Sequence, residues 1–315
     1  MSGGFDQQIR HDFERARHRA FVHELFAIFA NRPNDLIPYH EVRSRVAPQA
    51  ESYRGLQTVP VDQIVGSMDR FRDFDRAFLP RQRFTAGRWQ NIDRAWYEDK
   101  RLPPIQLYKV GDVYFVKDGN HRVSVAREKG QDYIDAEVIE GHIRAPLAAT
   151  MRPAELLLQA EYAEFLHRTN LDRLQPEHDI RPTALGRYDE IWQHIEGHRH
   201  WLEAIRHAAV PVSEAVQDWY AYIYEPIVRV ARERGVTERF PNHTEADIYL
   251  WVIRHRWELE RQLGHDIGPA PAAEDYAARI APSASMRERL LAPARPLRDW
   301  PRRVIRRMTR GRAAS

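Results

Sequence analysis

The sequence predicts an α+β protein, in which a small mixed sheet with its helices is followed by a mainly α-helical domain. The first reason is residues 102–140, LPPIQLYKVGDVYFVKDGNHRVSVAREKGQDYIDAEVIE, which alternate strand and helix patterns. The second is the chain beyond Pro153, which keeps a helical spacing of apolar residues as far as Gly264. One sheet domain and one helical domain account for both patterns.

The composition is that of a soluble chain without cysteine. A length of 315 residues favours two domains, and a hydrophobic content of 43% is enough for two cores. No apolar run approaches the roughly 20 residues of a membrane span, and the first residues lack the apolar stretch of a secretory signal. The absence of cysteine excludes disulfides, thiolate metal sites and cysteine nucleophiles. We therefore expect a cytoplasmic protein.

Residues 1–56 are expected to form N-terminal helices that pack on the next domain. The segment from Phe5 to Ala30 keeps apolar side chains near a 3.6-residue period, and the turn around Pro33 ends it. Leu36 to Val46 predicts a second, shorter helix. A partner-binding arm is the alternative role of this region.

The next domain, residues 57–145, is predicted to begin with a strand at Val59 to Val65. The segment Gly66 to Pro80 follows, and it is dense in side chains suited to phosphate or metal binding: Arg70, Arg72, Asp73 and Asp75. Asp73 and Asp75 are candidate ligands of Mg²⁺, which proteins hold with one or two carboxylates plus phosphate oxygens and water. The alternative is a solvated segment with internal ion pairs. Arg88 to Tyr97 predicts an amphipathic core helix.

Within residues 102–140 the pattern predicts a hairpin, a helix and a returning strand. Pro104 to Val110 and Val113 to Lys117 are strands around a Gly-Asp turn, and His121 to Lys129 is a short helix. Asn120 is a candidate N-cap, which leaves N–H groups free at the start of that helix. A helix N-terminus with such donors is an anion site, and the side chains of His121 and Arg122 add to it.

This segment resembles the core of the ParB/sulfiredoxin-like superfamily. Its members carry a Gly-x-x-Arg segment at the start of a helix that holds nucleotide phosphates. The resemblance covers residues 57–141 and places four residues on that segment: Gly119, Asn120, His121 and Arg122. It implies a nucleoside triphosphate or diphosphate with Mg²⁺ as cofactors. Arg70, from the arginine-rich segment after the first strand, is a candidate further phosphate contact.

One departure from the superfamily limits the chemistry. Sulfiredoxins need a cysteine where this chain has Asn120, so thiol catalysis is excluded. The aspartate-first form, Asp118-Gly119-x-x-Arg122, looks more like the free-serine kinases of the same superfamily. On this basis the candidate catalytic residues are Asp73, Asp118 and His121.

Residues 146–265 predict a helical domain with an internal similarity. Residues 190–202 match residues 247–259 at an offset of 57, each with an acid, isoleucine and aromatic residue followed by His-Arg and leucine. The matching apolar faces predict two related helices in contact. An anion site at the two His-Arg pairs is the alternative, and zinc at His194 and His198 is disfavoured because the glutamate between them is misplaced for a zincin helix.

The last segment, residues 266–315, is predicted to be a linker and a basic tail. From Arg287 to Arg312 there are ten arginines against two acids, a net charge of +8, so the rest of the chain carries 3 − 8 = −5. Trp300, Val304 and Met308 form an apolar stripe among these arginines. DNA or an anionic membrane surface are the expected partners of such a tail, with a disordered tail as the alternative.

Two functions follow from these patterns. The first is an enzyme for phosphoryl transfer or NTP hydrolysis, a kinase or an NTPase, because positioning and charge neutralisation carry most of that chemistry. The second is a nucleotide-gated DNA-binding or regulatory adaptor of the partition-protein type, without catalysis. A nucleotide is the partner in both cases, and assembly as a homodimer is left open.

Overall fold

The structure is a computed structural model that describes residues 3–30, 34–46, 51–141 and 143–280. The chain divides into two compact units, Met1–Glu164 and Phe165–Ser315. The basic tail, for which the sequence predicts polyanion binding, lies outside the described residues. None of the helices in the described ranges combines the length and the apolar character needed to cross a bilayer.

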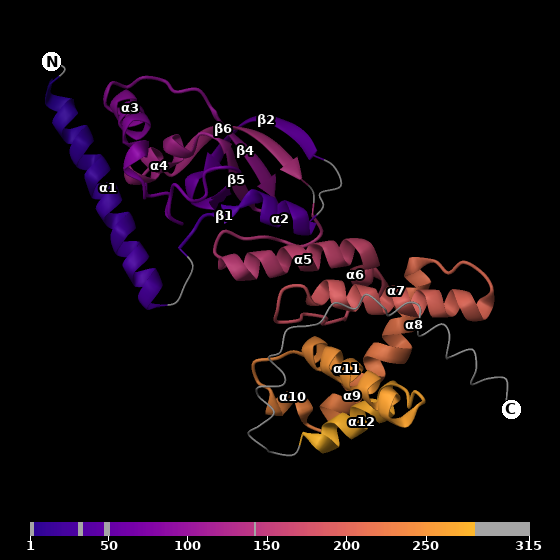
Figure 1. Ribbon diagram of the computed structural model, residues 1–315. Coiled ribbons are helices and arrows are strands. Elements are labelled where there is room, and N and C mark those ends of the chain that lie inside the picture. The colour runs from indigo at the N-terminus through magenta and orange to yellow at the C-terminus, as the bar shows by residue number, and fades with distance from the viewer. Residues whose placement is uncertain (1–2, 31–33, 47–50, 142, 281–315) are drawn as a thin grey trace. The chain divides into compact units, whose positions relative to one another are not determined.

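The first unit is built on a six-stranded mixed sheet, as expected for an α+β chain (Figure 1). The strand order is β1-β3-β5-β4-β6-β2, with β1, β3 and β5 parallel to one another. The other pairs are β4 with β5 and β2 with β6, both antiparallel, and β4 with β6, which is parallel. The strands are β1 Ile37–Pro38, β2 Glu51–Pro60, β3 Ile64–Ser67, β4 Ile105–Val110, β5 Val113–Asp118 and β6 Tyr133–Gly141.

Helices cover both faces of this sheet. The helical elements of the unit are α1 Gly3–Phe29, α2 Tyr39–Val46, η1 Val61–Gln63, η2 Arg83–Thr85, α3 Ala86–Tyr97, α4 Asn120–Glu128 and α5 Pro153–Thr169, which runs on into the second unit. On one face Val116 packs with Val123 of α4, and on the other Phe115 packs with Val42 of α2 and Leu156 of α5. Because both faces are covered, all four residues 113–116 of β5 are buried, which β-branched and aromatic side chains suit.

The long helix α1 lies along α3 and α4 (Figure 1). Its buried stripe of Phe13, Ala16 and Ala20 packs against Trp89 and Val125. The 3.6-residue period of the sequence therefore predicts the correct buried face. The residues expected to form only N-terminal helices also supply β1 and most of β2 to the sheet.

The strand predicted at Val59 to Val65 is wrong in its bounds. The chain forms β2 up to Pro60, a single 3-10 turn, and then β3 from Ile64. Proline has no N–H for a sheet ladder and fixes its own φ, so the chain turns there. One predicted strand is thus the end of one strand and the start of another, and these two lie in different parts of the sheet.

The second unit is helical in its described part. Its elements are α6 Leu171–Leu174, α7 Arg187–Arg206, α8 Val212–Trp219, the π-helical turn η3 Tyr220–Tyr224, α9 Glu225–Glu233, α10 Val236–Arg239, α11 Glu245–Leu263 and α12 Pro269–Arg279. Thr244 and Asp247 form a reciprocal capping box at the start of α11. Helix α12 replaces the start of the predicted linker, because its prolines stand at the first turn, where a helix tolerates them.

The two His-Arg helices, α7 and α11, are in contact as predicted. His194 of α7 hydrogen-bonds Tyr249 of α11 through Nδ1 and Oη at 3.0 Å, and Arg254 pairs with Glu190 at 3.2 Å. The offset of 57 also continues beyond these helices. His198 bonds Asp218 of α8 at 2.6 Å, and His255 bonds Asp275 of α12 at 2.6 Å. Each copy is therefore a helical hairpin closed by the same His–Asp pair.

Candidate functional site

The candidate site lies where β3 and β5 end side by side. The two strands are parallel, with Ser67 opposite Val116, so their carboxyl ends meet at the same sheet edge. The segment after β3 carries Arg70 and Asp73, and α4 starts just after β5 with His121 in its first turn. Ligands of open α/β sheets bind in the crevice outside such carboxyl ends.

His121 is the centre of this arrangement. Its ring meets the Phe74 ring edge-on at a centroid distance of 5.3 Å, and both ring nitrogens are buried without a hydrogen-bond partner. Burial, together with the charges of Arg70 and Arg88, lowers the pKa of His121 to about 4, and Asp73 opposes that shift. The imidazole is therefore neutral at pH 7 and stands in a positive field.

The start of α4 adds backbone donors to this field. The N-cap is Gly119, with φ +111°, and not Asn120 as predicted, because only glycine takes this backbone conformation without strain. The first helical bond runs from the Val123 N–H to the Gly119 carbonyl at 3.0 Å. The N–H groups before Val123 precede this bond and have no carbonyl acceptor within the helix. Asn120 is 7% exposed, and its Oδ1 has no hydrogen-bond partner.

Arg70 and Asp73 form an ion pair beside this helix start. Arg70 Nη1 lies 3.1 Å from Asp73 Oδ2, and the Arg70 N–H donates to Ser67 Oγ at 3.3 Å. The side chain of Arg70 stays 36% exposed. This ion pair agrees with the alternative prediction for the segment, a solvated stretch with internal ion pairs. Both side chains nevertheless lie close enough to His121 to shift the pKa of its imidazole.

Arg88 is the residue that the sequence did not identify. It stands in the first turn of α3, is exposed, and makes no ion pair within the described part of the chain. In the sequence it begins an amphipathic helix whose apolar face dominates the pattern. Only the packing of α3 against α4 brings its charge to His121, and no short-range signal predicts that packing.

Arg122 and Asp118 are directed elsewhere. Arg122 pairs with Asp118 and donates to the carbonyls of Pro103 and Pro104, the latter at 2.9 Å. Its guanidinium thus ties the start of α4 to the chain before β4. It also lines a separate cavity of about 350 Å³ together with Lys100. The neighbouring side chains of the DGNHR segment therefore point to different sites: His121 lies at the sheet edge, and Arg122 lines this cavity.

Asp75 is engaged in holding its own loop. Its Oδ1 accepts the N–H groups of Ala77 at 2.9 Å and Leu79 at 2.8 Å, and its Oδ2 lies 3.0 Å from Nδ1 of His23. Across the described residues no three histidine or carboxylate side chains are grouped to hold a metal ion. Asp73 is the other predicted metal ligand, and among the described residues its carboxylate pairs with the half-exposed side chain of Arg70.

Acidification below pH 6.5 is expected to destabilise the first unit through His121. Its folded pKa of about 4 lies below the ordinary value of 6.5, so the unfolded chain takes up the proton first. The free energy of unfolding that depends on a neutral His121 is fully present above pH 6.5 and is lost as the pH falls toward 4. The loss is up to roughly 3 kcal/mol, reduced by solvent screening because the ring is not fully buried. Urea unfolding at pH 7.5 and pH 5 measures it.

The matched variants are His121→Asn and His18→Asn, the latter on the exposed face of α1. The His121 variant should lose part of the pH dependence, and the His18 variant should keep all of it. An unchanged pH dependence in the His121 variant would assign the acid lability to other groups.

No protein-family model matches this chain, and neither the curated proteins nor the solved structures contain a match to it.

Proposed function

We propose that the first unit binds the phosphates of a nucleotide at the sheet edge formed by the start of α4, Arg70 and Arg88. The observation that carries the proposal is the neutral, half-buried His121, whose two ring nitrogens are buried without hydrogen-bond partners within reach of the charges of Arg70 and Arg88. Buried polar groups without hydrogen bonds are costly, so these two nitrogens call for a partner from outside the chain, such as water or a ligand. A phosphate group offers both the acceptors and the charge.

The resemblance of residues 57–141 to ParB/sulfiredoxin-like domains supports the nucleotide as the phosphate carrier. It is a proposal about the kind of domain, drawn from the order of strands, the glycine before the helix and the arginine three residues later. In this chain the arginine is held by Pro103, Pro104 and Asp118, so Arg70 and Arg88 take the phosphate-binding role.

The reaction class proposed is phosphoryl transfer or NTP hydrolysis. When Arg70 turns from Asp73 to a phosphate, the Asp73 carboxylate becomes available to orient a nucleophile or to share Mg²⁺ with phosphate oxygens. Asp118 is 68% exposed and can reach solvent-borne substrate only by leaving Arg122. A nucleotide-gated regulator without turnover is the second candidate, since Asp73 and Asp118 are each paired with an arginine and Asp75 holds its own loop.

A panel of CTP, ATP, ADP and GTP, with and without Mg²⁺, tests the proposal by calorimetry, thermal shift and product formation. We expect saturable binding of at least one nucleotide. Arg88→Gln should weaken it by about 1.5–3 kcal/mol, roughly 10- to 150-fold, because a charge-assisted contact is lost. This variant breaks no ion pair of the fold, unlike Arg122→Ala, which also releases the contacts to Pro103 and Pro104.

Arg10→Gln, at an exposed position of α1, is the matched control and should bind like the wild type. Binding without product in any member of the panel would select the regulator. Equal nucleotide affinity of the Arg88 and Arg10 variants, or no binding by any nucleotide, would refute the site.

A further inference from the structure

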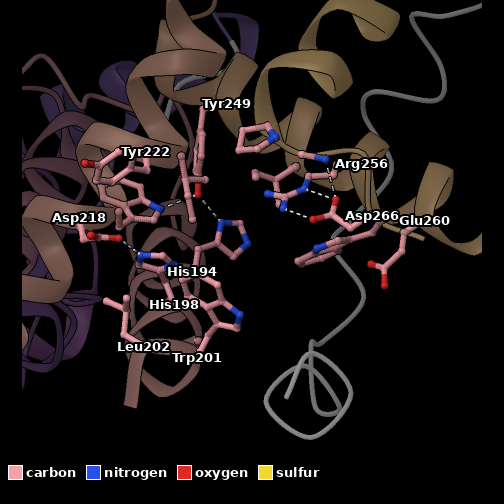
Figure 2. Close-up of a pocket in the computed structure, with 17 residues that line it drawn as sticks. His194, His198, Trp201, Leu202, Asp218, Tyr222, Tyr249, Arg256, Glu260 and Asp266 are labelled. Atoms are coloured by element: carbon pink, nitrogen blue, oxygen red, sulfur yellow. Dashed lines mark hydrogen bonds and ion pairs between the residues drawn. The ribbon is translucent and has the colours of Figure 1, made fainter. Parts of the chain in front are cut away.

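The second unit contains a cavity of about 510 Å³ that the proposed nucleotide site does not use. Its walls come from α7, α8, the π-helical turn η3 and α11, and Asp266, Gly268 and the first residue of α12, Pro269, complete the lining (Figure 2). A cavity of this size suits a small organic molecule.

The floor of the cavity is a fixed and uncharged chain of hydrogen bonds. Trp219 Nε1–H donates to Tyr249 Oη at 2.9 Å, and the Tyr249 hydroxyl shares a hydrogen bond of 3.0 Å with His194 Nδ1 (Figure 2). Trp219 and Tyr249 are fully buried, and burial lowers the pKa of His194 to about 4. The floor is thus preorganised and neutral at pH 7.

Aromatic rings line the walls and the mouth. Trp201 stacks on His198 at 5.3 Å, and Trp257 meets His194 edge-on at 5.5 Å. Tyr222 also lines the cavity, with 69% of its surface exposed. It stands on η3, and π-helical turns are frequent at functional sites because the extra residue redirects a helix face.

The charge of the lining is negative. It holds the carboxylates Asp218, Glu260 and Asp266 and the guanidinium of Arg256, so with neutral histidines the sum is −3 + 1 = −2. Arg256 is taken by Asp266 through two bonds, of 2.7 and 2.5 Å, and Asp218 accepts from His198. The Glu260 side chain makes no hydrogen bond or ion pair with the described residues. Its charge is therefore available to a ligand.

We propose that this cavity binds an organic cation, a protonated amine or quaternary ammonium with an apolar or aromatic body. Aromatic faces attract cations through the ring quadrupole, most strongly where water is excluded. Trp201, Tyr222 and Trp257 provide such faces, and Glu260 provides the counter-charge. A neutral ligand would leave this carboxylate without a partner, and an anion would be repelled by the net charge of the lining.

The internal duplication supplies the control position. At the offset of 57, Glu260 of α11 corresponds to Glu203 of α7, which accepts from His200 and from the Val210 N–H and does not line the cavity. The His–Asp pairs recur in both hairpins with the same length, so they join helices and are left intact in the test.

The test is calorimetric titration of the full-length protein with three probes of one shape and different charge: 2-phenylethylamine, 2-phenylethanol and phenylacetate, at pH 7.5. The amine should bind about tenfold more tightly than the alcohol, and phenylacetate should bind most weakly. Glu260→Gln should bring the amine-to-alcohol ratio close to one, and Glu203→Gln should leave it unchanged. Tyr222→Ala should weaken both the amine and the alcohol.

Three outcomes would overturn the proposal. One is phenylacetate binding as tightly as the amine, and another is an amine preference that survives in the Glu260 variant. The third is the absence of saturable binding by all three probes to protein whose circular dichroism shows it folded. None of these results bears on the nucleotide site, because the two sites share no residue.

Discussion

Replacing Lys129 by leucine is expected to lower the free energy of unfolding of the first unit by about 3–5 kcal/mol. The Lys129 ammonium lies 2.8 Å from Asp12 Oδ2 and 2.8 Å from Asp93 Oδ1, and 4.0 Å from the centre of the Tyr97 ring. Asp12 and Asp93 are both almost completely buried. Without the ammonium, two carboxylates stay in the interior with too little positive charge, which costs far more than the lost contacts alone.

The pH dependence identifies this cause. Burial already raises the pKa of Asp93 with Lys129 present, and removing the ammonium should raise it further. A carboxyl whose folded pKa lies above its unfolded pKa favours the folded state on protonation. The variant should therefore regain stability relative to wild type as the pH falls from 7.5 to 5, and urea unfolding at both values measures it.

Two further variants complete the test. Lys100→Leu removes an exposed lysine that pairs with Glu98 and should change stability by less than about 0.5 kcal/mol. The double variant Asp93→Leu/Lys129→Leu should recover part of the loss, since an apolar pair can replace a buried ion pair. A loss below about 1 kcal/mol in the single variant would show that water reaches the two carboxylates.

Gly119→Ala is expected to destabilise the first unit by about 3–5 kcal/mol, from strain and overlap together. The φ of +111° disfavours any side chain, and a Cβ at this position would lie 2.4 Å from Cγ2 of Ile105. Because β4 is held between β5 and β6, Ile105 has little room to move. The start of α4 would shift, and nucleotide binding at the sheet edge should fall with it.

Gly130→Ala separates the two contributions. Gly130 follows the same helix with φ +68°, but nothing lies within 4 Å of a Cβ built there. This variant should lose only the strain, about 1–2 kcal/mol. Equal losses for the two variants in chemical denaturation would mean that Ile105 yields without cost.

The parts that the sequence predicts correctly are those with local causes. The hairpin at 105–118 follows from β-branched strands around Gly111, whose φ of +61° suits the turn. The contact of α7 with α11, which the matching apolar faces predict, is made by polar side chains, His194 with Tyr249 and Glu190 with Arg254. The two-residue strand β1 has no pattern of its own. The Pro- and Ala-rich composition of α12 predicts a linker, yet the same residues are compatible with the start of a helix.

The candidate site shows the same division between local and long-range causes. Arg70, Asp73 and His121 come together because parallel strands align their carboxyl ends, which the strand order implies. The role of Arg122 depends on the Pro103 and Pro104 carbonyls, and that of Arg88 on packing between α3 and α4. The cavity of the second unit depends on η3, and a π-helical turn leaves no mark in the spacing of apolar residues.

The pairing of β2 with β6 has a consequence for synthesis on the ribosome. Glu51 pairs with Gly141 and Pro60 with Tyr133, so the partners of β2 lie more than 70 residues later in the chain. Asp12 likewise forms its ion pair with the much later Lys129. At roughly 5–20 residues per second, the chain up to Pro60 is made roughly 4–15 seconds before its partner Tyr133. During that interval the edge of β2 and the apolar stripe of α1 are uncovered. The nascent chain is thus most exposed to aggregation, and most in need of chaperones, before residue 141 leaves the exit tunnel.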